Sequence, residues 1–483
     1  MTASDTSTAP RRPATAWPLE NALLSAVLAA QRVPWIDAPA RALGLTPLTR
    51  RHLTRQVLAQ LRRTSSGGPT RLRTAFGTFL MPLTSDDAAG LLAHAEEAGA
   101  RGAVTALTAE GRRLRLTPHA APPDPPATVR ARIRRAADEA AAALLAVRRT
   151  DGSVARADWC ALTARLARRI VLGDEGADDS LVSAILEAAG RAEDSTEHTV
   201  RVAALRRRLD PYVHGARPDG SVAAACDEDA RDEVVEHALE TVTRALADTA
   251  AQALALMTVA PLTRASDRTE GAVSEALRRY PPLAATVHLV RTPFTWHGLA
   301  VEAGTEILCA TAWLRDLDDE HAHGDDDLSA ALCAAPGRCT AAELAVLAAV
   351  ELVRALTQEA EPVVLAPDLT AGALPDELPP ASLRLALAAA GAEPAVPVAG
   401  AGRVADGYVP PGAGQSPARY AGLVAAGARG LDEHARRLAD CARRPGWNHD
   451  AFGEQCRMTL LAHAERCARA AADARRAAEW LVN

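Results

Sequence analysis

The chain has 483 residues, a net charge of −6 and 48% hydrophobic residues, enough for one large domain with an appendage or about three ordinary domains. The mild charge argues against a general nucleic-acid binder or a membrane-surface protein. All 54 basic residues are arginine, and the excess of Ala, Leu, Arg and Glu favours helix, because these residues lose little side-chain entropy there.

The N-terminal segment has none of the features of a signal peptide. Residues 1–17 are polar and Pro-rich, and we expect them to be disordered. The apolar run at residues 22–30 is too short to span a bilayer, so no membrane segment is expected. The eight cysteines lack the spacing of a disulfide framework, which favours reduced thiols and a cytoplasmic protein.

The first part of the chain is expected to alternate helix and strand. The expected order is helix 18–45, helix 51–63, strand 70–75 and strand 78–82. Gly77, between the two strands, signals a hairpin. The Ser-Asp-Asp cluster at 85–87 is expected to cap the next helix, and the Pro-rich stretch 117–129 is expected to be a loop.

The middle of the chain is predicted to be helical almost throughout. Between residues 129 and about 255 the predicted breaks are at Gly152, 173–174, Gly190 and 216–221. A further helix is expected at 272–280, then a short β region at 287–310, an acidic solvated loop at 315–329 and a helix at 341–356.

The composition changes near residue 391. Residues 391–416 are rich in Gly, Pro and Ala and are expected to be a linker, and residues 417–483 a helical hairpin around a Pro-Gly turn. In each of the two predicted helices, Cys and His residues share one face: His434, Cys441, Cys456, His463 and Cys467. Packed together, these faces could form a metal site or simply a seam of small residues. The predicted fold class is mainly α (α+β), with small β-sheets, over residues 18–390, plus this hairpin.

Cys339 is the first residue that suggests chemistry. It follows a Pro-Gly-Arg turn and directly precedes an apolar helix. Free backbone N–H groups and the positive end of the helix dipole stabilise a thiolate at such a position. The thiolate could be a metal ligand or a nucleophile, whereas a protonated cysteine could simply fill core space.

Two further signals lie upstream of Cys339. Glu275 and Arg278 share one helix face, where such a pair stabilises a helix slightly. Arg291 follows Pro281-Pro282 and lies at the start of the β region. It could pair with a buried anionic group or be an ordinary strand arginine.

The order of these features resembles a known family. It resembles the C-terminal half of cytochrome P-450 haem-thiolate monooxygenases. The features that carry the resemblance are, in chain order, Glu-x-x-Arg, Pro-Pro, Arg291, an extended run, an acidic loop, and Pro-Gly-Arg-Cys before Leu344-Ala345. Residues 68–92 are similar to the first strands and helix of that family, and residues 159–185 look like its middle helices. The resemblance covers residues 51–390 and not the last ninety or so.

The resemblance implies a cytochrome P-450-like helical fold with haem b. Cys339 would be the axial ligand of the haem iron, and a thiolate ligand donates electron density that favours O–O cleavage. Glu275 and Arg278 would lock the core beneath the haem. The arginines implied for the two haem propionates are Arg291 for one, and Arg130 or Arg134 for the other.

The oxygen-activating site has two candidate registers. Read literally, the sequence "ALADTA" supplies Asp248 and Thr249 as an acid–alcohol pair. Counting back from Pro261, which should end the helix, places Arg244 and Ala245 there instead, and we favour this second register. The registers differ by about one turn, so Arg244 and Asp248 share a face and could pair.

The resemblance also has departures. Leu332 and Ala335 stand where the family usually has Phe and Gly, and the acidic segment 317–329 has no Arg to grip the Glu-x-x-Arg pair. A degenerate member without monooxygenase activity, binding a protein partner through the C-terminal hairpin, is therefore one alternative. A peroxide-driven haem-thiolate enzyme is another.

The leading hypothesis from the sequence is a haem-thiolate oxidoreductase. The resemblance implies monooxygenase-type oxidation of a small organic molecule, with secondary metabolism as its setting. Electrons would come from a ferredoxin or a flavin reductase, since the chain has no Gly-rich dinucleotide fingerprint.

Overall fold

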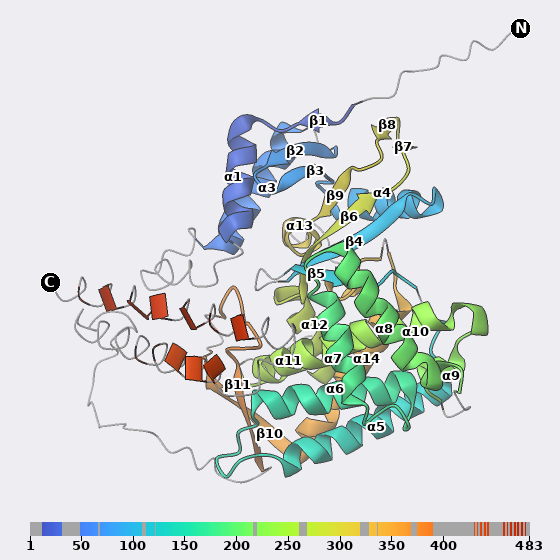
Figure 1. Ribbon diagram of the computed structural model, residues 1–483, viewed down its shortest axis with the longest axis vertical. Helices are drawn as coiled ribbons and strands as arrows, with labels where there is room; N and C mark the ends of the chain where they lie inside the picture. Colours follow the sequence, from blue (N-terminus) through green and yellow to red (C-terminus); the bar gives the residue numbers. More distant parts are fainter. Residues whose placement is uncertain are drawn as a thin grey trace, which may run out of the picture. The chain divides into compact units, whose positions relative to one another are not determined.

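The structure is a computed structural model. Outside the last part of the chain it describes residues 12–30, 49–65, 68–108, 113–120, 122–215, 220–259, 268–318, 328–335, 337–367, 369 and 374–389. Short pieces between 429 and 479 are also described. The chain divides into two compact units, residues 1–397 and 398–483. The larger unit is mainly helical with small β-sheets, so the predicted fold class is confirmed for it (Figure 1).

A mixed sheet supports the N-terminal part of the larger unit. Its described strands, in spatial order, are β1 (Ala14–Thr15), β2 (Thr70–Thr74), β3 (Gly77–Met81), β9 (Glu306–Cys309), β6 (Leu283–Val290), β4 (Arg101–Thr108) and β5 (Arg113–Leu116). β2 and β3 form the predicted hairpin, in which Thr74 pairs with Gly77. The φ of Gly77 is 141°, a conformation that glycine adopts easily. β4 and β5 lie where the sequence predicts no strand.

Three helices pack on this sheet: α1 (Pro18–Ala30), α3 (Arg50–Thr64) and α4 (Ser85–Glu97). Leu58 and Leu61 of α3 are fully buried with Leu72 and Met81 of the hairpin, which explains why the apolar positions of this helix recur at helical spacing. The cap of α4 is one residue earlier than predicted, because the Thr84 hydroxyl accepts from the Asp87 backbone N–H at 3.0 Å.

The predicted first helix is described only in part. α1 covers the beginning of the predicted helix at 18–45, and residues 31–48 lie outside the described residues.

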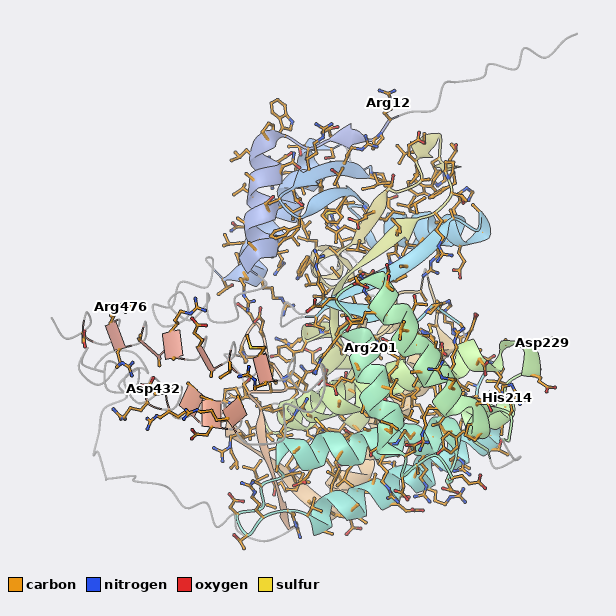
Figure 2. All side chains as sticks on the ribbon, viewed as in Figure 1. Arg12, Arg201, His214, Asp229, Asp432 and Arg476 are labelled. Carbon is orange, nitrogen blue, oxygen red and sulfur yellow. The ribbon has the colours of Figure 1, made fainter. Side chains whose placement is uncertain are left out.

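The helical part of the larger unit follows the predicted breaks. Its long described helices are α5 (Ala127–Ala146), α6 (Arg156–Leu172), α7 (Ser180–Gly190), α8 (Ser195–Val213), α10 (Arg231–Arg244), α11 (Ala250–Met257), α12 (Arg268–Arg279) and α14 (Thr340–Glu359); α9 (Val222–Ala225) is a single turn. They share one apolar core, in which α14 packs on α5, α10, α11 and α12. Polar side chains such as those of His214 and Asp229 are exposed (Figure 2).

α10 and α11 form one long helix with a π-helical turn between them at Ala245–Thr249. Such turns insert one extra residue and often occur at functional sites. Ala245, Leu246, Thr249 and Ala250 are all buried, and this stretch packs on α14. Both candidate registers for oxygen activation fall in or beside this turn. Pro261 lies outside the described residues.

Several elements differ from the prediction. The acidic stretch 315–329 is not all loop, because α13 (Thr311–Asp318) extends into it and Leu328–Ala331 form a 3₁₀ turn. The sequence also predicts no strands for β10 (Ala360–Ala366) and β11 (Arg384–Ala389), which pair with each other. β7 (Phe294–Trp296) and β8 (Leu299–Val301) form a hairpin inside the predicted β region. No described helix combines the length and apolar character needed to cross a membrane.

The smaller unit is described only in pieces. Its assigned residues are helical, and the Arg475 guanidinium pairs with the Asp432 carboxylate within the unit. The linker at 391–416 and the hairpin at 417–483 stay predictions. The five Cys and His positions named for this region lie outside the described residues.

The central strand β6 yields a prediction about pH. His288 is fully buried, and burial lowers its pKa to about 3, while its unfolded pKa is near 6.5. The unfolded chain therefore binds a proton below pH 6.5 that the folded chain does not take up until near pH 3. This contribution to stability is present above pH 6.5 and is lost as the pH falls.

We expect the buried His288 to lower the free energy of unfolding by about 2 kcal/mol when the pH falls from 7.5 to 5.0. Urea unfolding at both pH values should show a smaller pH-dependent loss for His288→Gln, whose side-chain amide can reach the position of Nε2, 2.9 Å from the Thr286 hydroxyl in the wild type. An equal loss in wild type and variant would mean that His288 does not titrate as described.

Candidate functional site

The loop before α14 places two cysteines together. Cys339 is the N-cap residue of α14, as predicted, and it is fully buried. Ser329 organises the loop, because its carbonyl accepts from the Leu332 and Cys333 backbone N–H groups at 3.0 and 2.8 Å. Its hydroxyl accepts from the Cys339 backbone N–H at 3.3 Å. These bonds fold the loop back so that Cys333 lies beside Cys339.

Two histidines complete a compact group, which we call the Cys/His cluster. One ligand atom from each of His119, His237, Cys333 and Cys339 lies within 4.8 Å of the others. His237 Nε2 is 3.3 Å from Cys333 Sγ and 3.5 Å from Cys339 Sγ. The two imidazole rings meet edge to face, with centroids 5.1 Å apart. Three of the four residues are buried and His119 is nearly so.

The contacts within the cluster shift the pKa values of its two thiols in opposite directions. A hydrogen bond from Cys333, and weaker contributions from His119 and His237, lower the pKa of Cys339 well below its ordinary value despite burial. The same contact, together with burial, raises the pKa of Cys333. The sequence left open whether Cys339 is a thiolate or a protonated core cysteine; the lowered pKa favours the thiolate, and neighbouring side chains lower it.

Glu240 on α10 connects the three segments that carry the cluster. It accepts from the Thr117 backbone N–H at 3.0 Å and from the Thr117 hydroxyl at 2.6 Å, two residues before His119. It also accepts from Arg244 at 2.9 Å, and Arg244 donates to the Leu332 carbonyl at 2.6 Å. The segment with His119 and the loop with Cys333 are thereby both tied to α10, which carries His237.

Arg101 holds the same loop from the sheet side. Its guanidinium donates to the Ala334 carbonyl at 3.1 Å and pairs with Glu96 at 3.0 Å. The other oxygen of the Glu96 carboxylate lies 3.8 Å from His119 Nδ1. His119 Nε2 is buried without a hydrogen-bond partner among the described residues. Glu96 therefore positions the Nδ1 side of the His119 ring, while Nε2 on the opposite side has no hydrogen bond among the described residues.

The predicted Glu275–Arg278 pair exists on α12. Arg278 donates to Glu275 at 3.1 Å, and Glu275 also pairs with Arg279. The Arg278 side chain is 43% exposed, so this contact lies at the protein surface rather than locked in a core. Neither Glu275 nor Arg278 lines the space beside the Cys/His cluster.

The arginines predicted for haem propionates do not converge on Cys339. Arg130 and Arg134 are exposed on α5, where Arg130 donates to the Pro125 carbonyl at 3.2 Å and Arg134 lies 3.4 Å from Glu351. Arg291 is exposed at the end of β6. None of the three lines the space beside the cluster, and their roles toward a cofactor stay predictions.

The two registers on the long helix can now be located. Asp248 accepts from Arg156 at 3.0 Å, whereas Arg244 pairs with Glu240, so each of the two residues has a different partner from the one expected. Both residues line one cavity, which confirms that they share a helix face. Thr249 is fully buried, and its hydroxyl has no hydrogen-bond partner among the described residues.

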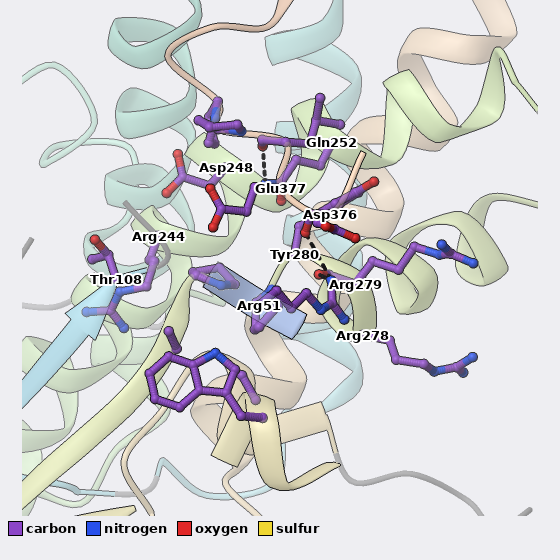
Figure 3. A pocket seen from close by; sticks show the side chains of 18 of the residues that line it. Arg51, Thr108, Arg244, Asp248, Gln252, Arg278, Arg279, Tyr280, Asp376 and Glu377 are labelled. Carbon is purple, nitrogen blue, oxygen red and sulfur yellow. Dashed lines mark hydrogen bonds between the residues drawn. The ribbon is translucent and has the colours of Figure 1, made fainter. Parts of the chain in front are cut away.

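The larger of the two cavities is separate from the Cys339 thiol. It has a volume of about 930 Å³, open solvent included, and Cys339 does not line it. Arg244, Asp248 and Gln252 are among the residues that do (Figure 3). Its apolar wall includes Leu114, Trp313 and Leu378. Gln252 is buried and donates to the Leu378 carbonyl at 2.9 Å, while its own Oε1 has no partner among the described residues. The cavity therefore combines apolar surface with a free hydrogen-bond acceptor.

The surroundings of Cys339 do not fit a haem, because this residue is fully buried and lines neither of the two cavities. The space beside the other three cluster residues, even with open solvent included, amounts to about 250 Å³, whereas small-molecule sites take roughly 300–1,000 Å³. Its interior has room for about one water molecule. The Cys339 sulfur contacts His237 and Cys333, so a macrocycle would have to displace both side chains.

Comparison with known proteins gives structural matches alone. No model of a protein family and no curated sequence matches the chain. Among solved structures, CYP108D1 from Novosphingobium aromaticivorans is 15% identical, with a TM-score of 0.47 over 76% of this chain and 99% of its own. CYP175A1 from a strain of Thermus thermophilus is 16% identical, with a TM-score of 0.45 over 74% and 98%.

A third structure, cytochrome P450 OleT F79A in complex with arachidonic acid, is 11% identical, with a TM-score of 0.46 over 78% of this chain and 99% of its own. The predicted resemblance to cytochrome P450 proteins is thus found among solved structures as well. All three TM-scores are below 0.5, so neither a cofactor nor a reaction follows from them.

The unpartnered hydroxyl of Thr249 yields a prediction. A buried hydroxyl without a hydrogen bond costs about 1–3 kcal/mol, so Thr249→Val should raise the unfolding free energy by about 1 kcal/mol. Thr163→Val is the matched control, because the Thr163 hydroxyl is equally buried but donates to the Trp159 carbonyl at 2.8 Å. That variant should be neutral or less stable.

Urea denaturation of both variants provides the measurement. Destabilisation of the Thr249→Val variant would mean that the hydroxyl has a partner in solution, as the register with Asp248 and Thr249 as an acid–alcohol pair requires.

Proposed function

We propose that this chain is a P450-like binding protein without a haem on Cys339, and that it binds a small organic molecule in the cavity lined by Gln252 and Trp313. One observation carries the proposal: the large cavity and the thiol are separate, and the thiol is enclosed by the Cys/His cluster. This corresponds to the degenerate family member considered from the sequence. A protein partner for the C-terminal hairpin remains part of the proposal.

The cavity wall defines the chemistry of the ligand. Leu114, Trp313 and Leu378 offer apolar surface, and burying it drives binding of an apolar body. Gln252 Oε1 is a buried acceptor without a partner among the described residues, so a hydroxyl or N–H on the ligand would satisfy it. Asp248 on the cavity wall pairs with Arg156, and Arg244 with Glu240. The ligand class is therefore an apolar molecule with at least one hydrogen-bond donor.

A haem-thiolate oxidoreductase is the second candidate. The position of Cys339 at the start of α14, with its lowered thiol pKa, favours it. It would act on a small organic molecule with a ferredoxin or flavin reductase, or with peroxide. This candidate requires His237 and Cys333 to move away from the Cys339 sulfur, which is the reason we rank it second.

Binding can be tested with a matched pair of probes, 2-naphthol and naphthalene, which differ by one hydroxyl. We expect 2-naphthol to bind more tightly, and Gln252→Met to weaken it by about fivefold while naphthalene is unaffected, because one hydrogen bond contributes about 1 kcal/mol. Isothermal titration calorimetry provides the affinities. Gln358→Met, on the exposed side of α14, is the control variant.

Equal affinities of wild type and the Gln252→Met variant for 2-naphthol would show that the free Oε1 does not select the ligand. Absence of binding by both probes would count against the cavity as a site for molecules of this class.

Haem content separates the two candidates. Protein purified from haem-replete cells is expected to be colourless and to give no carbon-monoxide difference band after reduction, because the thiol is already enclosed. A thiolate-type band that disappears in Cys339→Ala would establish the haem-thiolate candidate and overturn the binding-protein proposal.

A further inference from the structure

We propose that the Cys/His cluster is a structural zinc site, in which Cys333, Cys339, His119 and His237 hold one Zn²⁺. The site would join the segment before α5, helix α10 and the loop before α14. It goes beyond the proposed function, since ligand binding in the large cavity neither requires nor excludes it.

The two distances from His237 to the cluster sulfurs match a tetrahedral zinc site. Zn–S bonds of about 2.3 Å and Zn–N bonds of about 2.0 Å at the tetrahedral angle place sulfur and nitrogen about 3.5 Å apart. His237 Nε2 lies 3.3 Å from Cys333 Sγ and 3.5 Å from Cys339 Sγ. His119 contributes the fourth ligand atom within the same 4.8 Å limit. A simple hydrogen bond between a thiol and an imidazole needs one cysteine and one histidine, whereas two of each converge here.

The charge balance suits a buried metal. Two thiolates and two neutral imidazoles carry −2, which Zn²⁺ cancels, so the complete site is neutral in a region closed to solvent. Without a metal, His119 Nε2 is left buried and unsatisfied among the described residues.

The surrounding side chains orient the proposed ligands. Glu96 lies 3.8 Å from His119 Nδ1, on the ring atom opposite the free nitrogen, which is where carboxylates commonly orient a ligating histidine. Arg101 and Arg244 hold the carbonyls on either side of Cys333, those of Ala334 and Leu332. The cluster is therefore braced from both the sheet and α10.

The ligand set favours zinc and a structural role. Two thiolates and two imidazoles in a tetrahedron are typical of Zn²⁺, whereas Mg²⁺ and Ca²⁺ take oxygen ligands. Four protein ligands complete the coordination and leave no open position for substrate, which is typical of a structural site. The site would stabilise the contact between segments that are distant in sequence.

The test uses the full chain, expressed in zinc-supplemented medium and desalted. We expect about one zinc per chain by elemental analysis, and we expect Co²⁺ added to the metal-free protein to give the visible absorption of a tetrahedral site together with sulfur-to-cobalt charge transfer. Cys333→Ser and His237→Asn should each reduce zinc to background. Cys309→Ser is the matched control, because Cys309 is equally buried but lies outside the cluster.

Two further measurements keep the proposal open to disproof. A triple variant, Cys441→Ser, Cys456→Ser and Cys467→Ser, should retain the zinc and thereby exclude the C-terminal cysteines as its source. If the cluster variants fail to fold, the cobalt spectrum of the wild type and the loss of thermal stability on chelation decide instead.

Four outcomes would overturn the zinc proposal: wild-type protein that neither contains zinc nor binds Co²⁺, full zinc content in folded Cys333→Ser, an intact mass showing a Cys333–Cys339 disulfide in protein isolated without reductant, or haem ligated by Cys339. Failure of naphthol binding would affect the proposed function alone, and absence of zinc would affect the zinc proposal alone, whereas haem ligated by Cys339 would overturn both.

Discussion

Glu240 is the side chain on which the arrangement around Cys339 depends. This one carboxylate accepts hydrogen bonds from Thr117 and from Arg244, and Arg244 continues the chain of contacts to the Leu332 carbonyl. The carboxylate and guanidinium are nearly buried, so neither is well solvated and each depends on the other. Three segments that are remote in sequence are held at one point, and the two thiols and two imidazoles meet there as a result.

The same packing separates the Cys339 thiol from the large cavity, two features that the resemblance to cytochrome P-450 proteins would combine. With His237 against the Cys339 sulfur, the thiol is fully buried, and the larger free volume lies farther along α10 and α11, beside Arg244, Asp248 and Gln252. A residue at the position of a haem ligand therefore does not imply a haem. The volume next to that residue decides the question, and volume is a property of packing rather than of a motif.

Local signals predicted much of this molecule. Gly77 identified the hairpin, and the Pro-Gly-Arg turn before an apolar run identified Cys339 as the start of α14, because both depend on neighbouring residues alone. β4 was missed because it pairs with β6, which lies far away in sequence, and β5 is an edge strand that pairs with β4.

The cluster could be predicted only in part, for a similar reason. Cys333 lies six positions before Cys339, and that short spacing was a usable signal. His119 lies in a Pro-rich loop and His237 in a helix, and no spacing relates them to the cysteines before the chain folds. The exposure of Arg130, Arg134 and Arg291 likewise depends on how α5 and β6 are covered.

The distance along the chain between the cluster residues has a consequence for how the protein is made. His119 and Cys339 are 220 positions apart, so the loop that their contact closes contains most of the helical core. Closing so long a loop is entropically costly before the helices between them are in place. On the ribosome, His119 and His237 emerge before either cysteine is synthesised, and domains fold as the chain lengthens. The four side chains can therefore meet only after residue 339 has been synthesised, which makes their contact a late step of folding rather than its nucleus.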